Sequence, residues 1–283
     1  MFLSEQTIDR YIQEDASYFD LTTYVLDIGT HQGTIKYINR HKAVVSGVEV
    51  VVRIFEKLGA RVESYIASGT LAAADTTIFI AHGPVESLQT GWKVCMNILE
   101  HSSGIATRTH SLVTKAKGIN PKVEIVTSRK IFPGTKELAI QGILDGGALP
   151  HRLGLSETVL IFKEHTNFLG GIDGLIENLD DIKTRACEKR VIVEAENHDD
   201  SIRLCKAGVD GIQFDKIEPL SLKDIVADLR AINPNIILIA AGGINEGNVE
   251  KYAESGVDAI NTSWVYFGKP VDIRVEMKPY ITE

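Results

Sequence analysis

The stretch VIVEAENHDDSIRLCKAGVDGIQFD (residues 191–215) holds two short apolar runs separated by a helical pattern. VIVEAE and GIQFD have the length of strands and are mainly apolar, as is typical of strands covered on both faces. The helical pattern DSIRLCKAG follows Asp199, a residue type that often begins a helix. Because strands joined through a helix usually run parallel, this stretch predicts a strand–helix–strand unit of a parallel sheet.

The same order of elements recurs from residue 120 onward. Further helix starts are indicated by Ser221 with Asp224, which form a capping-box-like pair, and by Asn245. Each unit takes roughly 20–35 residues, which is typical of a covered parallel sheet or a barrel. A (β/α) barrel fits better than an open sheet, because no strand is followed by a glycine-rich dinucleotide motif. The apolar runs are VEIVTS (123–128), TVLIFK (158–163), VIVEAE (191–196), GIQFD (211–215), IILIAAGG (236–243) and DAINTS (258–263).

The first hundred residues have a different pattern, in which short strands and helices are mixed. GTIKYINRHKAVVSG (33–47) alternates as antiparallel strands do, and residues 61–84 predict two strands about a turn. VEVVVRIFEKLGA (48–60) has helical spacing and closes on a glycine. Residues 91–118 are helical in pattern and long enough to connect two domains.

The composition excludes several classes of protein. The chain of 283 residues has 30 Lys and Arg against 38 Asp and Glu, a net charge of −8, which disfavours a nucleic-acid partner. Its three cysteines have no metal-ligand spacing and predict no disulfide framework. No window approaches about 18 consecutive apolar residues, and the first residues lack the pattern of a signal peptide. We therefore expect no membrane partner and a cytoplasmic location.

Charged, glycine or hydroxyl residues follow the apolar runs. In barrels of this class, active-site groups lie at the carboxyl ends of the strands. Of Glu194 and Glu196, which share one face of a strand, we favour Glu194 as the residue that reaches the site. The loop GGALPHRLG adds His151 and Arg152. The residues at the strand ends are Arg129, Lys130, Lys163, Glu194, Glu196, Asp215, Lys216, Gly242, Gly243, Thr262 and Ser263.

These residues describe a ligand. The glycine pair with Thr262 and Ser263 suits a phosphate group, which backbone amides bind well. Glu194 and Asp215 suit hydroxyl groups, and the arginines suit further phosphate or carboxylate. A phosphorylated sugar that carries a pyrophosphate meets this description.

The stretch TSRKIFPGTKELAIQGILDGGALPHRLGLSETVLIFKEH (127–165) resembles the quinolinate (nicotinate-nucleotide) phosphoribosyltransferases. Their core motif is T-R-K-T-x-P-G followed by G-G-x-x-x-H-R-x-G-L. The blocks VIVEAEN, GIQFD, AAGGIN, EHSSGIAT and EDASYFDLTT match in order and spacing, so the resemblance covers nearly the whole chain. The final segment INTSWVYFGKPVDIRVEM is similar to a subgroup, the ModD-type pyrophosphorylases associated with molybdate transport.

The resemblance implies an α/β sandwich domain (residues 1–108, with the tail 270–283) and an open barrel of about seven strands (109–269). It implies a homodimer in which one subunit helps to close the other's site. The implied enzyme is a glycosyltransferase of the pentosyltransferase type. With Mg²⁺, it transfers ribose 5-phosphate from phosphoribosyl pyrophosphate to a heterocyclic nitrogen.

The resemblance also assigns roles to individual positions. It implies catalytic roles for Lys130, Glu194 and Asp215, the two carboxylates also contacting Mg²⁺ directly or indirectly. It implies a 5-phosphate site at Gly242, Gly243, Thr262 and Ser263. The residues it implies for the acceptor and pyrophosphate are Lys93, Arg129, His151, Arg152, Phe162, Lys163 and Lys216.

Four positions depart from the family pattern, and one of them is Glu164, which stands where the family has an asparagine before the histidine. Phe162 stands where the family motif L-I-K-x-N-H has its lysine, and Lys163 is one position later, which points to the opposite face of a strand. Lys93 and Lys216 replace an arginine and an asparagine of the family. A phenyl ring cannot pair with a carboxylate, so the dicarboxylate quinolinate is disfavoured as the acceptor.

Three alternatives remain open on sequence alone. In the first, the chain is a quinolinate phosphoribosyltransferase in which a local bulge returns Lys163 to the site. In the second, it is a protein without catalytic activity that binds molybdate or a precursor of a molybdenum cofactor. In the third, it is a degenerate barrel retained for an interaction.

Overall fold

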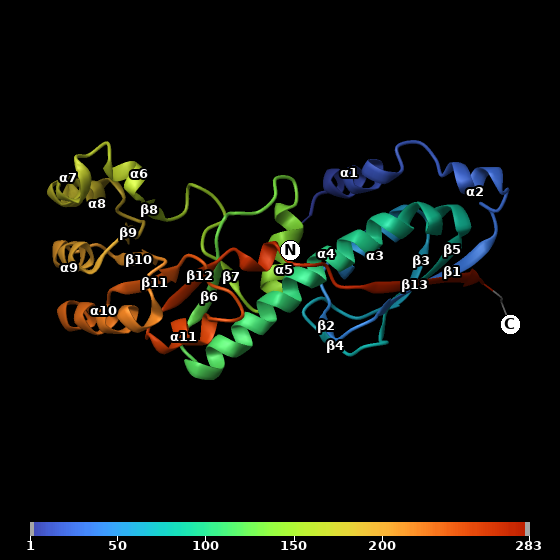
Figure 1. Cartoon of the computed structure of the whole chain (residues 1–283). Helices are drawn as coiled ribbons and strands as arrows, with labels where there is room; N and C mark the ends of the chain where they lie inside the picture. Colours follow the sequence, from blue (N-terminus) through green and yellow to red (C-terminus); the bar gives the residue numbers. More distant parts are fainter. Residues whose placement is uncertain (1–2, 281–283) are drawn as a thin grey trace. The chain divides into compact units, whose positions relative to one another are not determined.

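The computed structural model describes residues 3–280, and these form two compact units (Figure 1). The first unit contains the described residues up to 110, residues 132–147 and residues 266–280. The second contains residues 111–131 and 148–265. Helix α4 (Val85–Ile119) contributes residues to both units, as its long helical pattern predicts.

An antiparallel sheet of four strands forms the framework of the first unit. Its order is β13 (Ile273–Pro279), β1 (Gln32–Asn39), β5 (Thr77–Pro84) and β3 (Arg61–Tyr65). The tail of the chain therefore pairs with β1 along seven residues, from Gly33 opposite Pro279 to Asn39 opposite Ile273. Residues 281–283 of the expected tail lie outside the described residues.

One face of this sheet carries the hydrophobic core of the first unit. The rings of Tyr37, Phe55 and Phe79 are fully buried, and Phe55 stacks on Phe79 with 5.3 Å between ring centroids. Phe55 belongs to α3 (Val48–Lys57), whose apolar face covers the strands. Burial of aromatic side chains on this scale contributes roughly 1.5–3 kcal/mol each, so the α/β sandwich has its own core.

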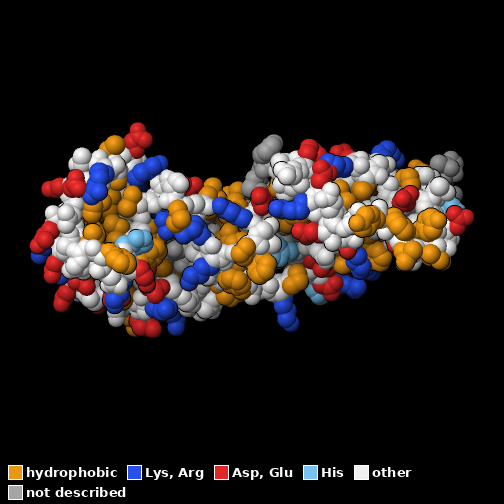
Figure 2. All heavy atoms as spheres, turned by 90° about the horizontal axis from the view of Figure 1, so that it is seen from above, with side chains coloured by type: hydrophobic (Ala, Val, Ile, Leu, Met, Phe, Trp, Pro, Cys, Tyr) orange, Lys and Arg blue, Asp and Glu red, His pale blue; other side chains and the backbone are white. Residues whose placement is uncertain are grey.

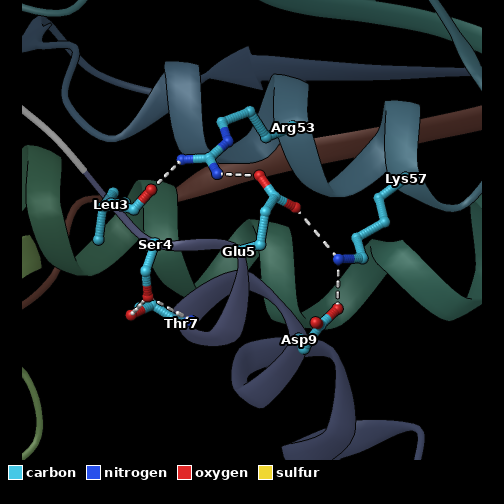
Figure 3. A network of polar contacts seen from close by, with 7 residues as sticks. All are labelled: Leu3, Ser4, Glu5, Thr7, Asp9, Arg53 and Lys57. Atoms are coloured by element: carbon cyan, nitrogen blue, oxygen red, sulfur yellow. Dashed lines mark hydrogen bonds and ion pairs between the residues drawn. The ribbon is translucent and has the colours of Figure 1, made fainter.

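Helix α1 (Glu5–Asp15) is held on α3 by a network of ion pairs (Figure 3). Arg53 donates to the carbonyl of Leu3 at 2.7 Å and pairs with Glu5. Lys57 bridges Glu5 and Asp9 at 3.1 and 2.5 Å. These pairs lie at the surface, where ion pairs add little to stability, and they mainly fix the position of α1.

Seven parallel strands form the sheet of the second unit. Their order is β7, β6, β12, β11, β10, β9 and β8, and each pair of neighbours except β12 and β6 is joined along the chain through one or more helices. The predicted open barrel of about seven strands is therefore confirmed, together with the predicted sandwich. The strands are β6 (Glu124–Thr127), β7 (Leu149–Pro150), β8 (Val159–Ile161), β9 (Val191–Ala195), β10 (Gly211–Asp215), β11 (Ile237–Ala241) and β12 (Ala259–Thr262).

Two related aspartates fasten the amino-terminal ends of the strands. Asp210 accepts from the backbone N–H of Val191 at 2.7 Å, and Asp258 accepts from that of Leu238 at 2.7 Å. Each carboxylate also pairs with a cation from a helix, Lys183 or Arg230 respectively. These contacts hold the amino-terminal ends of the strands together.

The remaining elements connect the strands of the four-stranded and seven-stranded sheets or lie beside them. Among residues 3–280, no helix combines the length and apolar composition that crossing a membrane requires. The helices are α2 (Leu21–Val25), α5 (Lys136–Asp145), α6 (Lys163–Thr166), α7 (Gly171–Glu177), α8 (Leu179–Arg185), α9 (His198–Ala207), α10 (Pro219–Ile232) and α11 (Val249–Glu254); β2 (Ala43–Val44) and β4 (Leu71–Ala72) form a small separate sheet.

The predicted helix starts are wrong by a few residues. Helix α9 begins after Asn197, whose side chain accepts from the backbone N–H of Asp200, and so precedes the predicted start at Asp199. Helix α10 begins at Pro219, before the pair Ser221 and Asp224, because proline is favoured at a first helical position. Helix α11 begins only after Asn248, because Asn245 instead forms a turn in which it accepts from the N–H of Gly247.

Candidate active site

A cavity of about 590 Å³ opens at the carboxyl ends of the strands of the second unit. Every residue that lines it belongs to this unit. Figure 2 shows Lys and Arg side chains close together on the face of this unit that the view presents. The predicted site residues that line the cavity are Arg129, Lys130, His151, Arg152, Phe162, Glu194, Asp215, Gly242, Gly243, Thr262 and Ser263.

Strand alternation explains which side chains reach the cavity. Successive side chains of a strand point to opposite faces, so residues two apart share a face. On β10 the residues that line the cavity are Gln213 and Asp215. Beyond β8, Phe162 still has an extended backbone and follows Leu160 on the same face. The interior face of the barrel therefore continues into the walls of the cavity.

The cationic side of the cavity follows β6 and β7. His151 is anchored by its backbone N–H, which donates to the carbonyl of Thr127 at 2.9 Å. Burial lowers the pKa of His151, and the neighbouring Arg152 lowers it further. Burial also lowers the pKa of Arg152, and the positive charge of Arg129 adds to this effect. Positive charges that line one partly buried cavity repel one another, so an anion placed among them is stabilised.

Glu194 and Asp215 form the acidic side. Glu194 accepts from Nε2 of Gln213 at 2.8 Å. Burial raises the pKa of Glu194, the bond from Gln213 lowers it, and the charge of Asp215 raises it again. Asp215 pairs with Lys216 at 3.4 Å. Glu196 does not line the cavity, so of the two glutamates the structure brings Glu194 to the site.

These two carboxylates fit a magnesium ion. Mg²⁺ is usually bound by one or two carboxylates together with water and substrate phosphates. Glu194 and Asp215 line one cavity, and burial together with the charge of Asp215 raises the pKa of Glu194, a cost that a bound cation would offset. Among the described residues no group of three or more His, Cys, Asp or Glu is placed to hold a metal ion by itself. The donor set thus suits an ion that arrives with a phosphorylated substrate.

The glycine pair follows β11. Gly242 and Gly243 have φ values of +86° and +70°, a left-handed conformation that glycine adopts without strain. A Cβ atom on Gly242 would lie 2.3 Å from the carboxylate of Asp215 and 2.7 Å from the backbone nitrogen of Lys216. Nothing lies within 4 Å of the corresponding position on Gly243. Gly242 is therefore required for close packing, whereas Gly243 faces open space.

The two hydroxyls after β12 have different surroundings. Thr262 donates to the carbonyl of Ile244 at 2.7 Å and accepts from the N–H of Trp264 at 3.0 Å, so its hydroxyl fastens the loop after the glycines. Ser263 lines the cavity beside it. The expected helix directly after Asn245 is absent from this position, because α11 begins at Val249. The loop residues Gly242 to Asn245, rather than a helix N-terminus, therefore line this end of the cavity.

Three predicted site residues do not line the cavity. Lys163 begins α6 and forms an ion pair with Glu196 at 2.9 Å. Lys216 extends into solvent, with 76% of its side chain exposed. Lys93 lies on α4 in the first unit, with its amino group 4.2 Å from the ring centroid of Trp92. The alternative in which a bulge returns Lys163 to the site is therefore not what the structure shows.

The prediction also missed several residues that line the cavity. Gln213 and Asn261 precede the predicted Asp215 and Ser263 by two positions, and strand alternation is the signal that identifies them. They were missed because amide side chains within an apolar run carry no charge. The others are Ser128, Leu160, Ala241, Ile244, Asn245 and Trp264.

Comparison with known proteins accords with this geometry. The family model "Quinolinate phosphoribosyl transferase, N-terminal domain" matches residues 20–103, and the model of the C-terminal domain matches residues 105–276. A relative from Escherichia coli O157:H7, named "Putative pyrophosphorylase ModD", is 33% identical over 279 residues, which cover 99% of this chain and 98% of the relative. The nicotinate-nucleotide pyrophosphorylase (carboxylating) of Dictyostelium discoideum is 26% identical over an alignment that covers 98% of this chain and 96% of the relative.

Solved structures have the same fold. The NadC structure from Streptococcus pyogenes superposes with a TM-score of 0.89 at 20% identity and covers 99% of this chain and 100% of that one. The nicotinate-nucleotide pyrophosphorylase from Francisella tularensis superposes with a TM-score of 0.88 at 22% identity and covers 98% of both chains. With two family models that together span most of its length, the chain belongs to the quinolinate phosphoribosyl transferase family.

Proposed function

We propose that this chain is a phosphoribosyltransferase that transfers ribose 5-phosphate from phosphoribosyl pyrophosphate to a nitrogen of a planar heterocycle. The observation that carries the proposal is the division of one cavity into three chemically different sides. Cations follow β6 and β7, carboxylates lie at the carboxyl ends of β9 and β10, and a glycine turn follows β11. A donor with a pyrophosphate, a ribose and a 5-phosphate matches these sides in turn.

Each side then has a part in the reaction. Arg129, Lys130 and Arg152 stabilise the negative charge that grows on the departing pyrophosphate. Glu194 and Asp215 stabilise the positive charge that develops on the ribose. Both effects are stronger in a partly buried cavity than in water. The glycine turn holds the 5-phosphate through backbone amides.

Mg²⁺ belongs to the proposal as a partner of the donor. Glu194 and Asp215 would hold it, directly or through water. When bound, the ion neutralises pyrophosphate oxygens and so assists their departure. The carboxylates themselves keep their role towards the ribose.

The proposed acceptor is less anionic than quinolinate. Phe162 lines the cavity, whereas the neighbouring Lys163 is paired with Glu196 outside it. An aromatic ring stacks well on a flat heterocycle but cannot pair with a carboxylate. Because the final segment resembles the ModD-type subgroup associated with molybdate transport, we include in the proposal a link to molybdenum transport or metabolism in the cytoplasm.

The proposed assembly is a homodimer. Six large apolar side chains around α2 are 59–95% exposed, and we call this set the α2 patch: Tyr18, Phe19, Leu21, Tyr24, Val25 and Leu26. Figure 2 shows hydrophobic side chains gathered on the part of the first unit where α2 lies. A contiguous apolar surface of this kind usually marks an interface. Lys93 would then act at the site of the neighbouring subunit.

The acceptor assignment is tested by assaying quinolinate with phosphoribosyl pyrophosphate and Mg²⁺. We expect the wild-type protein to convert quinolinate poorly. Its kcat/KM should be roughly a thousandfold lower than that of an enzyme suited to quinolinate, which corresponds to a loss of about 4 kcal/mol in transition-state stabilisation. Phe162→Lys should improve the conversion, while Phe168→Lys, at a side chain that is 90% exposed, should not. Efficient conversion by the wild type, with no gain in Phe162→Lys, would identify a quinolinate enzyme instead.

A further inference from the structure

The loop 242–248 connects β11 to α11, and its residues Gly242 to Asn245 line the cavity of the proposed active site. Two of these residues are glycines with a positive φ, and nothing lies within 4 Å of the position that a Cβ would take on Gly243. Glycine gives a chain more conformational freedom than any other residue. A binding site made from such a loop therefore needs contacts that hold the loop in place.

Several side-chain hydrogen bonds join one part of this loop to another. The backbone N–H of Asn245 donates to Oδ1 of Asn248 at 2.8 Å, and the N–H of Gly247 donates to Oδ1 of Asn245 at 2.8 Å. The amide nitrogens of both asparagines donate to the carbonyl of Gly243, at 3.1 and 3.2 Å. These bonds fix the shape of the loop, but they do not fix its position on the barrel.

Glu246 joins the loop to α4, in the part of that helix that belongs to the second unit. Oγ of Ser111 donates to Oε1 of Glu246 at 2.6 Å, and Nζ of Lys115 lies 3.4 Å from the same oxygen. Nζ of Lys115 also donates to the backbone carbonyl of Glu246 at 3.3 Å. Ser111 and Lys115 are four residues apart and so share one face of the helix. Both the side chain and the main chain of Glu246 are therefore held from outside the loop.

The contacts of Glu246 lie outside the cavity. Neither Glu246 nor its partners Ser111 and Lys115 line it, whereas Thr262, which also holds the loop, does. The hydrogen bond from Ser111 lowers the pKa of Glu246, burial raises it, and Lys115 lowers it again. The carboxylate is therefore ionised at neutral pH, and a hydrogen bond to an ionised group is stronger than one between neutral groups.

We infer that Glu246 is a positioning residue that, with Ser111 and Lys115, holds the loop 242–248 where it binds the 5-phosphate of phosphoribosyl pyrophosphate. The inference rests on the proposed function and deepens it, because recognition of one part of the donor then depends on a residue outside the cavity. The cations that receive the pyrophosphate follow β6 and β7 and have no contact with Glu246 among the described residues. Loss of Glu246 should therefore weaken recognition of the 5-phosphate and leave recognition of the pyrophosphate intact.

The test compares two ligands, of which only one carries the 5-phosphate. Isothermal titration calorimetry in the presence of Mg²⁺ gives the affinity of each variant for phosphoribosyl pyrophosphate and for pyrophosphate. Glu246→Ala should bind phosphoribosyl pyrophosphate about tenfold more weakly than the wild type, because a charge-assisted hydrogen bond that holds the loop is lost. Its affinity for pyrophosphate should stay the same, whereas a general loss of structure would weaken both ligands.

Three further variants sharpen the test. Glu246→Gln keeps an oxygen that accepts from Ser111 and removes the charge, so it should recover part of the lost affinity. Ser111→Ala removes the same hydrogen bond from the side of the helix and should show the same selective loss, even if Glu246→Ala does not fold. Glu250→Ala, at an exposed glutamate of α11, is the matched control and should bind both ligands as the wild type does. Circular dichroism establishes that each variant is folded.

The outcomes separate this inference from its foundation. Wild-type protein that fails to bind phosphoribosyl pyrophosphate contradicts the proposed function itself. If the wild type binds it and Glu246→Ala and Ser111→Ala bind it equally well, the loop is held without Glu246 and only the inference is wrong. An equal loss for both ligands would mean that Glu246 supports the fold in general, which also overturns the inference. A loss confined to phosphoribosyl pyrophosphate is the result we expect.

Discussion

At the scale of single residues, the cations of the cavity are poised for an anion. The pKa of Arg152 is lowered by its burial and then by the charge of Arg129, and Glu157 offsets this only in part, so the two arginines destabilise each other. Bound pyrophosphate reverses this effect and adds charge-assisted hydrogen bonds. Arg152→Ala should therefore weaken binding of phosphoribosyl pyrophosphate by about ten- to a hundredfold, or roughly 1.5–3 kcal/mol, in isothermal titration calorimetry.

A matched control separates this loss from a change in net charge. Arg185→Ala removes an arginine whose exposed side chain pairs with Asp181 on α8. Exposed ion pairs of this kind contribute little, so both affinity and stability should stay close to those of the wild type. Equal affinities in the Arg152 and Arg185 variants would mean that the cation cluster has another role.

Glu194 should make stability depend on pH. Its pKa is raised in the folded protein, mainly by burial, so the native state holds this proton more tightly than the unfolded state does. The contribution to the free energy of unfolding is then full at low pH and is lost as the pH rises through the raised pKa. Glu194→Gln should increase Tm at about pH 7.5, and the gain should vanish near pH 4, around the ordinary pKa of a carboxyl group.

The comparison for Glu194 is Glu188→Gln, at an exposed glutamate of the same unit. It should shift Tm little at either pH, because an exposed carboxylate loses no hydration on folding. If the Glu194→Gln variant is less stable than the wild type at neutral pH, the folded protein stabilises the carboxylate of Glu194. That result would contradict the burial cost that we infer for this group. Scanning calorimetry at the two pH values measures both variants.

The charged residues of the site were predictable from sequence because the carboxyl ends of parallel strands lie together at one end of the barrel. Once β6 to β12 are in register, Arg129, Glu194 and Asp215 must share one end of the barrel. Lys163 shows the limit of this rule. A single residue beyond Phe162, the chain turns into α6, and the lysine pairs with Glu196. Side-chain partners of this kind depend on tertiary distances that a strand pattern does not contain.

At the scale of elements, the turn after β11 depends on one glycine more than on the other. Gly242→Ala combines a left-handed backbone with contacts below 3 Å to Asp215 and Lys216. We expect it to lower the free energy of unfolding by about 2–4 kcal/mol, since strain of each kind costs on the order of 1–3 kcal/mol. Chemical denaturation measures this loss, and affinity for phosphoribosyl pyrophosphate should fall with it.

Gly243→Ala is the matched control within the same turn. It has a positive φ of +70° but no atom within 4 Å of the added Cβ. Its cost should be confined to backbone strain, about 1–2 kcal/mol. If the two alanine variants are equally stable, close packing at Gly242 does not shape the turn.

Strands were predicted better than helix starts, for a physical reason. A buried strand needs an apolar run whatever its surroundings, and six of the seven barrel strands have one. The seventh, β7, is two residues long, contains Pro150 and lies at the edge of the sheet, where a missing N–H is tolerated. Helix starts depend on which of several capping residues is used, and nearby asparagines such as Asn245 and Asn248 compete for that role.

At the scale of the whole molecule, the α2 patch is exposed in a single chain. We predict that the protein sediments as a dimer at micromolar concentration and that this patch lies in the interface. Leu21→Asp places a charge on the patch, where desolvation opposes association, and should shift the protein towards monomer. Sedimentation velocity measures both species.

The control for assembly is Leu220→Asp, at an 84% exposed leucine on α10 of the other unit. It should sediment like the wild type. A wild-type protein that is monomeric at micromolar concentration would contradict both the dimer and the proposed role of Lys93 at a neighbouring site. Nothing in the sequence pattern alone requires the dimer, because exposed apolar residues are recognised only once the fold shows which side chains remain uncovered.

The most direct test of the account compares two anions on the wild-type protein. Isothermal titration calorimetry with phosphoribosyl pyrophosphate, in the presence and absence of Mg²⁺, is set against a titration with molybdate. We predict saturable binding of phosphoribosyl pyrophosphate that Mg²⁺ strengthens, and no comparable binding of molybdate. Tight binding of molybdate with no binding of phosphoribosyl pyrophosphate would show that the cavity is an anion carrier's site and would contradict the proposed transferase.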